Sequence, residues 1–124
     1  MIKQAIIPLA GLGTRLLPLT SVFAKELLPI NGKPGIEFIL DECIEAGIKE
    51  VIFIISKKKQ MIKKYFYNDQ FYKKIIKKKK DPRILAEYKK ILKYKKMIKF
   101  VYQNNPLGTG DAVLKTKKFI KDKY

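Results

Sequence analysis

The amino-acid sequence predicts an open α/β sheet of mainly parallel strands with helices on both faces. Three observations favour this fold class. Short apolar runs rich in β-branched residues recur along the chain, and such runs suit parallel strands buried on both faces. Segments with helical spacing separate these runs, as in βαβ units. Two glycine-containing loops each follow an apolar run, where ligands bind in such sheets.

The first expected strand covers residues 3–9 and opens into a glycine turn at 11–17. A short apolar segment at 26–30 then leads to Asn31-Gly32, a pair typical of tight turns. Because proline suits the first turn of a helix, a helix is expected from Pro34 to about Ala46.

That helix should bury one apolar stripe and end at Gly47, a natural C-terminal cap. A second buried strand follows at 50–56, which completes a strand–helix–strand unit with an expected right-handed crossover. The members of the stripe are Ile36, Ile39, Leu40, Cys43 and Ile44.

From residue 57 to 99, lysines alternate with apolar and aromatic residues at helical spacing. A further helix is expected after Asp81-Pro82, and a third strand at 97–102. A second glycine loop then leads into a final helix from Asp111 onward. The predicted order is β-α-β-α-α-β-α, and both glycine loops should lie at the same edge of the sheet.

The composition limits the class of protein. A chain of 124 residues is one small domain or part of a larger one, and 47% hydrophobic residues can supply a core. No apolar run approaches the roughly 18 residues of a membrane span, and the N-terminus does not resemble a signal peptide. The single cysteine, Cys43, excludes an internal disulfide and favours the cytoplasm. Without histidine, imidazole metal sites and Ser-His or Cys-His pairs are excluded.

The formal net charge of +17 has two explanations that the sequence leaves open. It arises from 28 basic and 11 acidic residues, and all but two of the basic residues are lysines. Such charge suits a polyanion-binding module for RNA or an anionic surface. Lysine, isoleucine and tyrosine also have A/T-rich codons, so mutational drift could produce the same composition.

The most informative segment is AGLGTRLLPLTSVFAKELLPINGKP, from Ala10 to Pro34. Its G-x-G lacks both the third glycine of the dinucleotide fingerprint and the Gly-Lys-Ser/Thr of the P-loop. The longer pattern G-x-G-T-R-L-x-P, followed by K-E-L-L-P-I, resembles that of sugar-1-phosphate nucleotidylyltransferases. Lys25-Glu26 and the segment QNNPLGTGDAVL, from Gln103 to Leu114, are most similar to the branch that uses UTP and glucose 1-phosphate.

The resemblance implies a Rossmann-like nucleotidyltransferase fold of the GT-A type, and it assigns roles to matching positions. Arg15 and Lys25 would be the catalytic residues that neutralise the reacting phosphates. Glu26 would orient neighbouring groups or pair with a lysine, and Gln103 would hydrogen-bond the uracil edge beside Gly108. The nucleotide-binding set is Leu9, Ala10, Gly11, Gly13, Thr14, Arg15, Lys25, Glu26, Gln103 and Gly108.

The resemblance also implies Mg²⁺ as cofactor, but the family's metal-binding aspartates match no position of this sequence. We therefore expect residues 1–124 to be the nucleotide-binding portion of such an enzyme, a fragment or a shortened reading frame, inactive or weakly active alone. A homo-oligomer or a complementing chain stays open, as does a thymidylyltransferase-like specificity. Asp111 is expected to cap its helix rather than bind metal.

Overall fold

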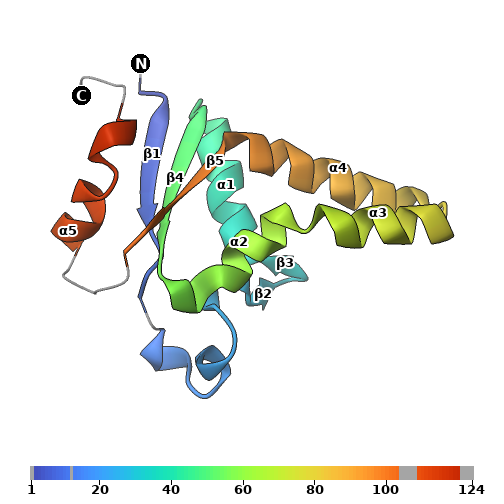
Figure 1. The fold of residues 1–124 in the computed structure, drawn as a ribbon, viewed down its shortest axis with the longest axis horizontal. Helices are drawn as coiled ribbons and strands as arrows, with labels where there is room; N and C mark the ends of the chain where they lie inside the picture. Colours follow the sequence, from blue (N-terminus) through green and yellow to red (C-terminus); the bar gives the residue numbers. More distant parts are fainter. Residues whose placement is uncertain (1, 12, 104–108, 121–124) are drawn as a thin grey trace.

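The computed structural model describes residues 2–11, 13–103 and 109–120. In these residues the main sheet has three parallel strands in the order β1-β4-β5 (Figure 1). They are β1 (Gln4–Pro8), β4 (Glu50–Ile55) and β5 (Ile98–Tyr102). The three predicted strands are confirmed, each shorter by one or two terminal residues.

Helices cover both faces of this sheet, as predicted. Figure 1 shows α1 (Gly35–Glu45), α2 (Gln60–Tyr67) and α4 (Pro82–Met97) on one side of the sheet and α5 (Thr109–Leu114) on the other. Five short 3-10 helices lie in the connections: η1 (Thr14–Leu16), η2 (Leu19–Ser21), η3 (Lys25–Leu27), η4 (Lys57–Lys59) and η5 (Lys117–Phe119).

The predicted turn before α1 is a small hairpin. Strand β2 (Pro29–Ile30) pairs antiparallel with β3 (Lys33–Pro34). Between them Asn31 and Gly32 both have positive φ, 52° and 76°, which these residues adopt at low cost. At the other end of α1, Gly47 has φ 82° and caps the helix as predicted.

The region from 57 to 99 holds three helices rather than the two expected. The first helical stretch is interrupted at Asn68, which has a non-helical backbone and separates α2 from α3 (Asp69–Lys78). Asp81 caps α4 by accepting a hydrogen bond from the Arg83 N–H at 2.9 Å. Figure 1 shows α3 and the first half of α4 projecting away from the sheet as a helical hairpin.

The last predicted helix is present, but it is short and begins earlier than expected. Helix α5 begins at Thr109, two residues earlier than expected, and ends at Leu114. The hydroxyl of buried Thr116 donates to the Val113 carbonyl at 2.6 Å. This competition of a side chain with helical hydrogen bonding explains the early end.

Strand β4 is the centre of the core, since its five residues from Val51 to Ile55 are fully buried. Apolar residues of α1, α2 and α4 pack against it. The predicted α1 stripe is confirmed for Ile36 and Leu40, whereas Cys43 and Ile44 are partly buried at its margin.

A polar cluster that the sequence did not predict joins α1 to its neighbouring helices. Glu37 is 1% exposed, yet Tyr65 donates to its Oε2 at 2.5 Å, and the Lys90 ammonium lies 3.1 Å from Oε1. One turn later, Asp41 accepts hydrogen bonds from Lys33 and from the Tyr94 hydroxyl, the latter at 2.6 Å. The buried Glu37 carboxylate is tolerated because hydrogen-bond donors lie within its reach.

Candidate functional site

One glycine loop follows β1 and the other follows β5. Both loops begin beside the carboxyl end of β4, which lies between these two strands. The Leu9 N–H donates to the Ile54 carbonyl at 2.7 Å, and the Gln103 N–H donates to the Ile55 carbonyl at 2.8 Å. The prediction that the two loops share one sheet edge is confirmed for these starting residues. Gly108 lies outside the described residues.

The first glycine turn is built around Gly13. Its φ of 66° favours glycine, and a Cβ atom there would lie 3.1 Å from Thr20 Cγ2 and 3.3 Å from Lys25 Cδ. The Thr20 hydroxyl donates to the Gly13 carbonyl at 2.6 Å. The missing side chain therefore lets the Lys25 stem pack on the turn. At Gly11, an added Cβ would meet no atom within 4 Å.

The two predicted catalytic cations face solvent beside this turn. Arg15 is exposed on η1, next to exposed Thr14, and Lys25 is exposed at the start of η3. Neither cation forms an ion pair with a residue in the described ranges. Cations that are not neutralised within the protein can bind an anionic ligand, and both belong to one connected segment after β1.

Glu26 faces inward, unlike Lys25. Its carboxylate oxygens lie 2.5 and 3.0 Å from the Lys59 ammonium, and the two side chains are 5% and 6% exposed. Next to this pair, the Ala24 N–H donates to the Met61 sulfur at 3.0 Å. These contacts attach the segment carrying Lys25 to η4 and to the start of α2.

Sequence reasoning missed Lys59, although it allowed Glu26 a lysine partner. Lys59 stands in a run of three lysines whose other members, Lys57 and Lys58, are exposed. The sequence offered one indication that Lys59 belongs near the site, namely its place three residues after the predicted strand 50–56.

Gln103 lies at the end of β5 and is 6% exposed. Its side-chain amide donates to Asp111 Oδ2 at 3.0 Å, so these two predicted positions are in contact. Leu9 is buried and Ala10 is half-buried at the start of the first loop. The carboxylate of Asp111 thus orients the Gln103 amide from the first turn of α5.

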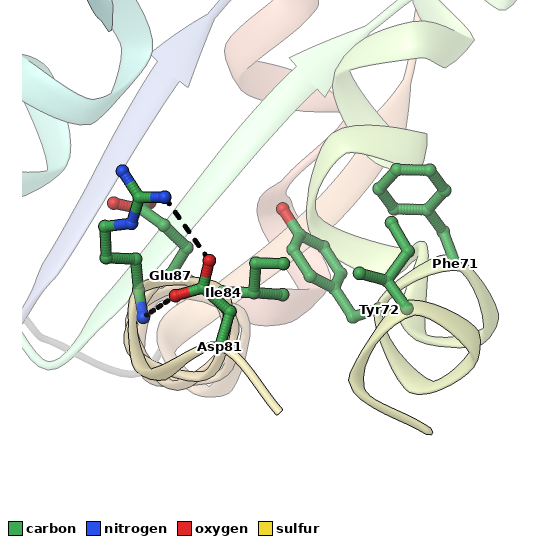
Figure 2. A pocket seen from close by; sticks show the side chains of 7 residues that line it. Phe71, Tyr72, Asp81, Ile84 and Glu87 are labelled. Carbon is green, nitrogen blue, oxygen red and sulfur yellow. Dashed lines mark hydrogen bonds and ion pairs between the residues drawn. The ribbon is translucent and has the colours of Figure 1, made fainter. Parts of the chain in front are cut away.

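Neither a metal-ligand cluster nor a cavity identifies the candidate site. Within the described part of the chain, no three His, Cys, Asp or Glu side chains are grouped so that they could hold a metal ion. A cavity of 410 Å³ lies between α3 and α4, with Phe71 and Tyr72 on one side and Asp81, Ile84 and Glu87 on the other (Figure 2). It belongs to the projecting hairpin rather than to the loops at the sheet edge.

Several named proteins are similar to this chain in sequence, and solved structures among them are also similar in fold. UTP–glucose-1-phosphate uridylyltransferases from Streptococcus pyogenes and Streptococcus pneumoniae are 38% identical over 119 residues, covering 96% of this chain and 39% of each relative. A solved UDP-glucose pyrophosphorylase from Acinetobacter baumannii has a TM-score of 0.85 at 38% identity, covering 98% of this chain and 42% of that one. A UTP-bound UGPase from the same species also has a TM-score of 0.85 at 38% identity, with coverage of 96% and 42%.

This chain therefore spans about two fifths of the length of these relatives. The family model described as Nucleotidyl transferase matches residues 4–124. The parallel sheet and its glycine turn are the fold that the resemblance predicted. Because the match extends over nearly the whole sequence, the chain belongs to the nucleotidyl transferase family.

Proposed function

We propose that this chain binds UTP at the carboxyl edge of its sheet, as the nucleotide-binding portion of a UTP–glucose-1-phosphate uridylyltransferase. The reaction converts UTP and glucose 1-phosphate into UDP-glucose and pyrophosphate. One observation carries the proposal most strongly. Gly13 leaves room for the stem of Lys25 to pack on a turn whose cations face solvent, in a chain 38% identical to a UTP-bound structure.

The chemistry requires positioning and charge neutralisation rather than a covalent intermediate. A phosphate oxygen of glucose 1-phosphate attacks the α-phosphorus of UTP in line, and pyrophosphate leaves. In this proposal Arg15 binds the triphosphate through its planar guanidinium, and Lys25 stabilises charge near the reacting phosphorus. The open space beside Gly11 lets a phosphate approach the backbone, with Thr14 at the following turn.

The opposite loop would recognise the base. We propose that the Gln103 amide, oriented by Asp111, hydrogen-bonds the uracil edge. Leu9 and Ala10 would lie beside the nucleotide, and Gly108 would leave room for the base. A thymidylyltransferase-like specificity is the second candidate, because dTTP offers the same imide edge.

Mg²⁺ is the cofactor implied by the family resemblance, but the described residues supply no cluster of ligands for it. The proposal therefore assigns no step to a metal and limits the work of these residues to binding and orienting the nucleotide. We expect the purified 124-residue chain to form UDP-glucose weakly or not at all. Turnover at a rate typical of a complete enzyme, roughly 1 per second or more, would contradict the expectation.

Calorimetric titration of the 124-residue chain with UTP tests nucleotide binding directly. Arg15→Met and Lys25→Met should each weaken binding by roughly 10- to 100-fold, as expected for a lost charge-assisted contact. Lys49→Met is the matched control, because Lys49 is exposed at the other end of β4. Failure of the wild-type chain to bind UTP, or equal loss in the control, would refute the proposal. Competition with dTTP distinguishes the two bases.

The proposal also covers where the protein acts and how it assembles. No helix of the described residues is long and apolar enough to cross a membrane. We propose a cytoplasmic enzyme, acting as a homo-oligomer or with a complementing chain. Sedimentation of the purified protein with and without UTP measures the assembly state.

A further inference from the structure

The positive charge of this protein is concentrated in one region. Residues 57–99 hold 18 basic and 3 acidic side chains, a net +15 out of the +17 of the whole chain. Residues 1–56 hold five basic and six acidic side chains. Mutational drift toward A/T-rich codons would enrich lysine throughout the sequence, so drift alone does not account for this distribution.

Six of these lysines form a continuous cationic face on α3 and the residues after it. This lysine face consists of Lys73, Lys74, Lys77, Lys78, Lys79 and Lys80, all exposed. Lys74 and Lys78, three and seven residues after Phe71, lie on the same side of α3 as Phe71, whereas Lys73 and Lys77 lie farther around the helix. None of the six forms an ion pair with a described residue. The face is therefore cationic and uncompensated.

Exposed apolar side chains lie on the same hairpin. Phe71 of α3 is 53% exposed and Leu85 of α4 is 41% exposed. Phe71 also borders the cleft between the two helices (Figure 2). The acidic residues of that cleft are compensated, since Asp81 pairs with Arg83 at 3.3 Å and Glu87 pairs with Lys90 at 3.0 Å.

We propose that the α3–α4 hairpin docks this protein on an anionic lipid surface. Mobile headgroups accept lysine as a point charge, and each lysine near such a surface attracts it independently. Phenylalanine and leucine side chains insert at the boundary between headgroups and acyl chains. Because the hairpin projects from the sheet (Figure 1), a flat surface can reach it without meeting the nucleotide edge.

The same observations disfavour a nucleic acid as the partner. Stacking of successive bases needs several open aromatic faces, but Tyr72 and Tyr88 are stacked on each other, with ring centroids 5.1 Å apart and planes 13° apart, which leaves Phe71 as the exposed aromatic ring of the hairpin. Arginine provides bidentate phosphate recognition, yet the only arginine of the hairpin, Arg83, is paired with Asp81. The hairpin groups that have no ion-pair or stacking partner are the lysine face and the exposed apolar side chains. This combination suits a lipid surface.

Co-sedimentation of the 124-residue chain with vesicles tests the proposal. Vesicles containing about 30% phosphatidylserine should bind the chain at about 0.15 M salt, whereas neutral phosphatidylcholine vesicles should not. The variant K73Q/K74Q/K77Q/K78Q should bind several-hundred-fold more weakly, from roughly a fivefold loss for each lysine near the surface. Phe71→Ser should reduce binding without changing net charge, roughly tenfold.

The matched control removes the same charge from scattered exposed positions, K49Q/K64Q/K115Q/K117Q. It should weaken binding by less than about threefold, because these lysines do not share one face. If the two quadruple variants lost vesicle binding equally, net charge alone would explain the binding, and the proposal would be overturned. Binding to single-stranded RNA at the same salt without vesicle binding would overturn it in favour of a nucleic-acid partner. Thermal melts of both variants establish that each is folded.

Discussion

Replacing Lys59 with methionine would leave the Glu26 carboxylate buried without its cation. Water cannot take the place of the ammonium, since the Glu26 side chain is only 5% exposed. Removing one partner of such a pair costs about 3–5 kcal/mol in unfolding free energy. With an unfolding entropy of about 2.1 cal/mol/K per residue over this length, the melting temperature should fall by roughly 12–19 °C.

Thermal melts and urea denaturation followed by circular dichroism measure this loss. Lys58→Met is the matched control, because Lys58 is the exposed neighbour in the same 3-10 helix. Its unfolding free energy should stay within about 0.5 kcal/mol of wild type. The double variant Glu26→Leu/Lys59→Met should regain most of the stability, since apolar replacement of both ions is often neutral or stabilising.

Two results would refute the reasoning. A Lys59→Met protein that melts within about 2 °C of wild type would mean that solvent or another cation reaches Glu26. A double variant no more stable than the single one would mean that the loss comes from the Lys59 stem and its packing rather than from the unpaired carboxylate.

Four further predictions address other positions. Gly13→Ala should cost about 1–2 kcal/mol, because its φ of 66° is strained for alanine and the new methyl group presses on Lys25. Gly11→Ala should leave stability within about 0.5 kcal/mol and weaken UTP binding only, so a large loss of stability there would contradict the open space beside it. Tyr65→Phe removes a donor to buried Glu37 and should cost about 1–3 kcal/mol in urea denaturation, whereas Tyr67→Phe, at an exposed position, should cost little. Although burial opposes the shift, hydrogen bonds from Lys33 and Tyr94 lower the pKa of Asp41. Because the folded pKa lies below the unfolded one, this stabilisation is complete above about pH 4 and is lost as pH falls further. Asp41 is partly exposed, so the effect should be under about 1 kcal/mol. Asp41→Asn should flatten the acid side of the stability profile by that amount, and an unchanged profile would count against the interaction.

Much of the fold could be predicted because its signals are local. The buried strand 50–56 was evident as a continuous β-branched run, and the turn at Asn31-Gly32 was evident because few other residues tolerate positive φ. The candidate nucleotide-binding residues Gly13, Arg15 and Lys25 came from the family pattern that the sequence resembles. Whether those residues bind UTP stays a prediction.

The features that were missed depend on tertiary contacts. No local pattern distinguishes buried Lys59 from Lys57 and Lys58, because its burial depends on Glu26, 33 residues away. The break between α2 and α3 at Asn68 interrupts a stretch whose apolar spacing is helical throughout. Glu37 does not belong to the apolar stripe predicted for α1, and its burial depends on Tyr65 and Lys90, which come from helices later in the chain.

The central position of β4 has a consequence for motion. Its neighbours β1 and β5 both pair with it, and its residues from Val51 to Ile55 have no exposed surface. Its amide hydrogens should therefore exchange with solvent only through global unfolding, and be the slowest in the protein. Leu9 and Gln103 donate their amide hydrogens to the last carbonyls of this strand. The first residues of the two loops are thus held at a fixed spacing by the most stable strand of the sheet.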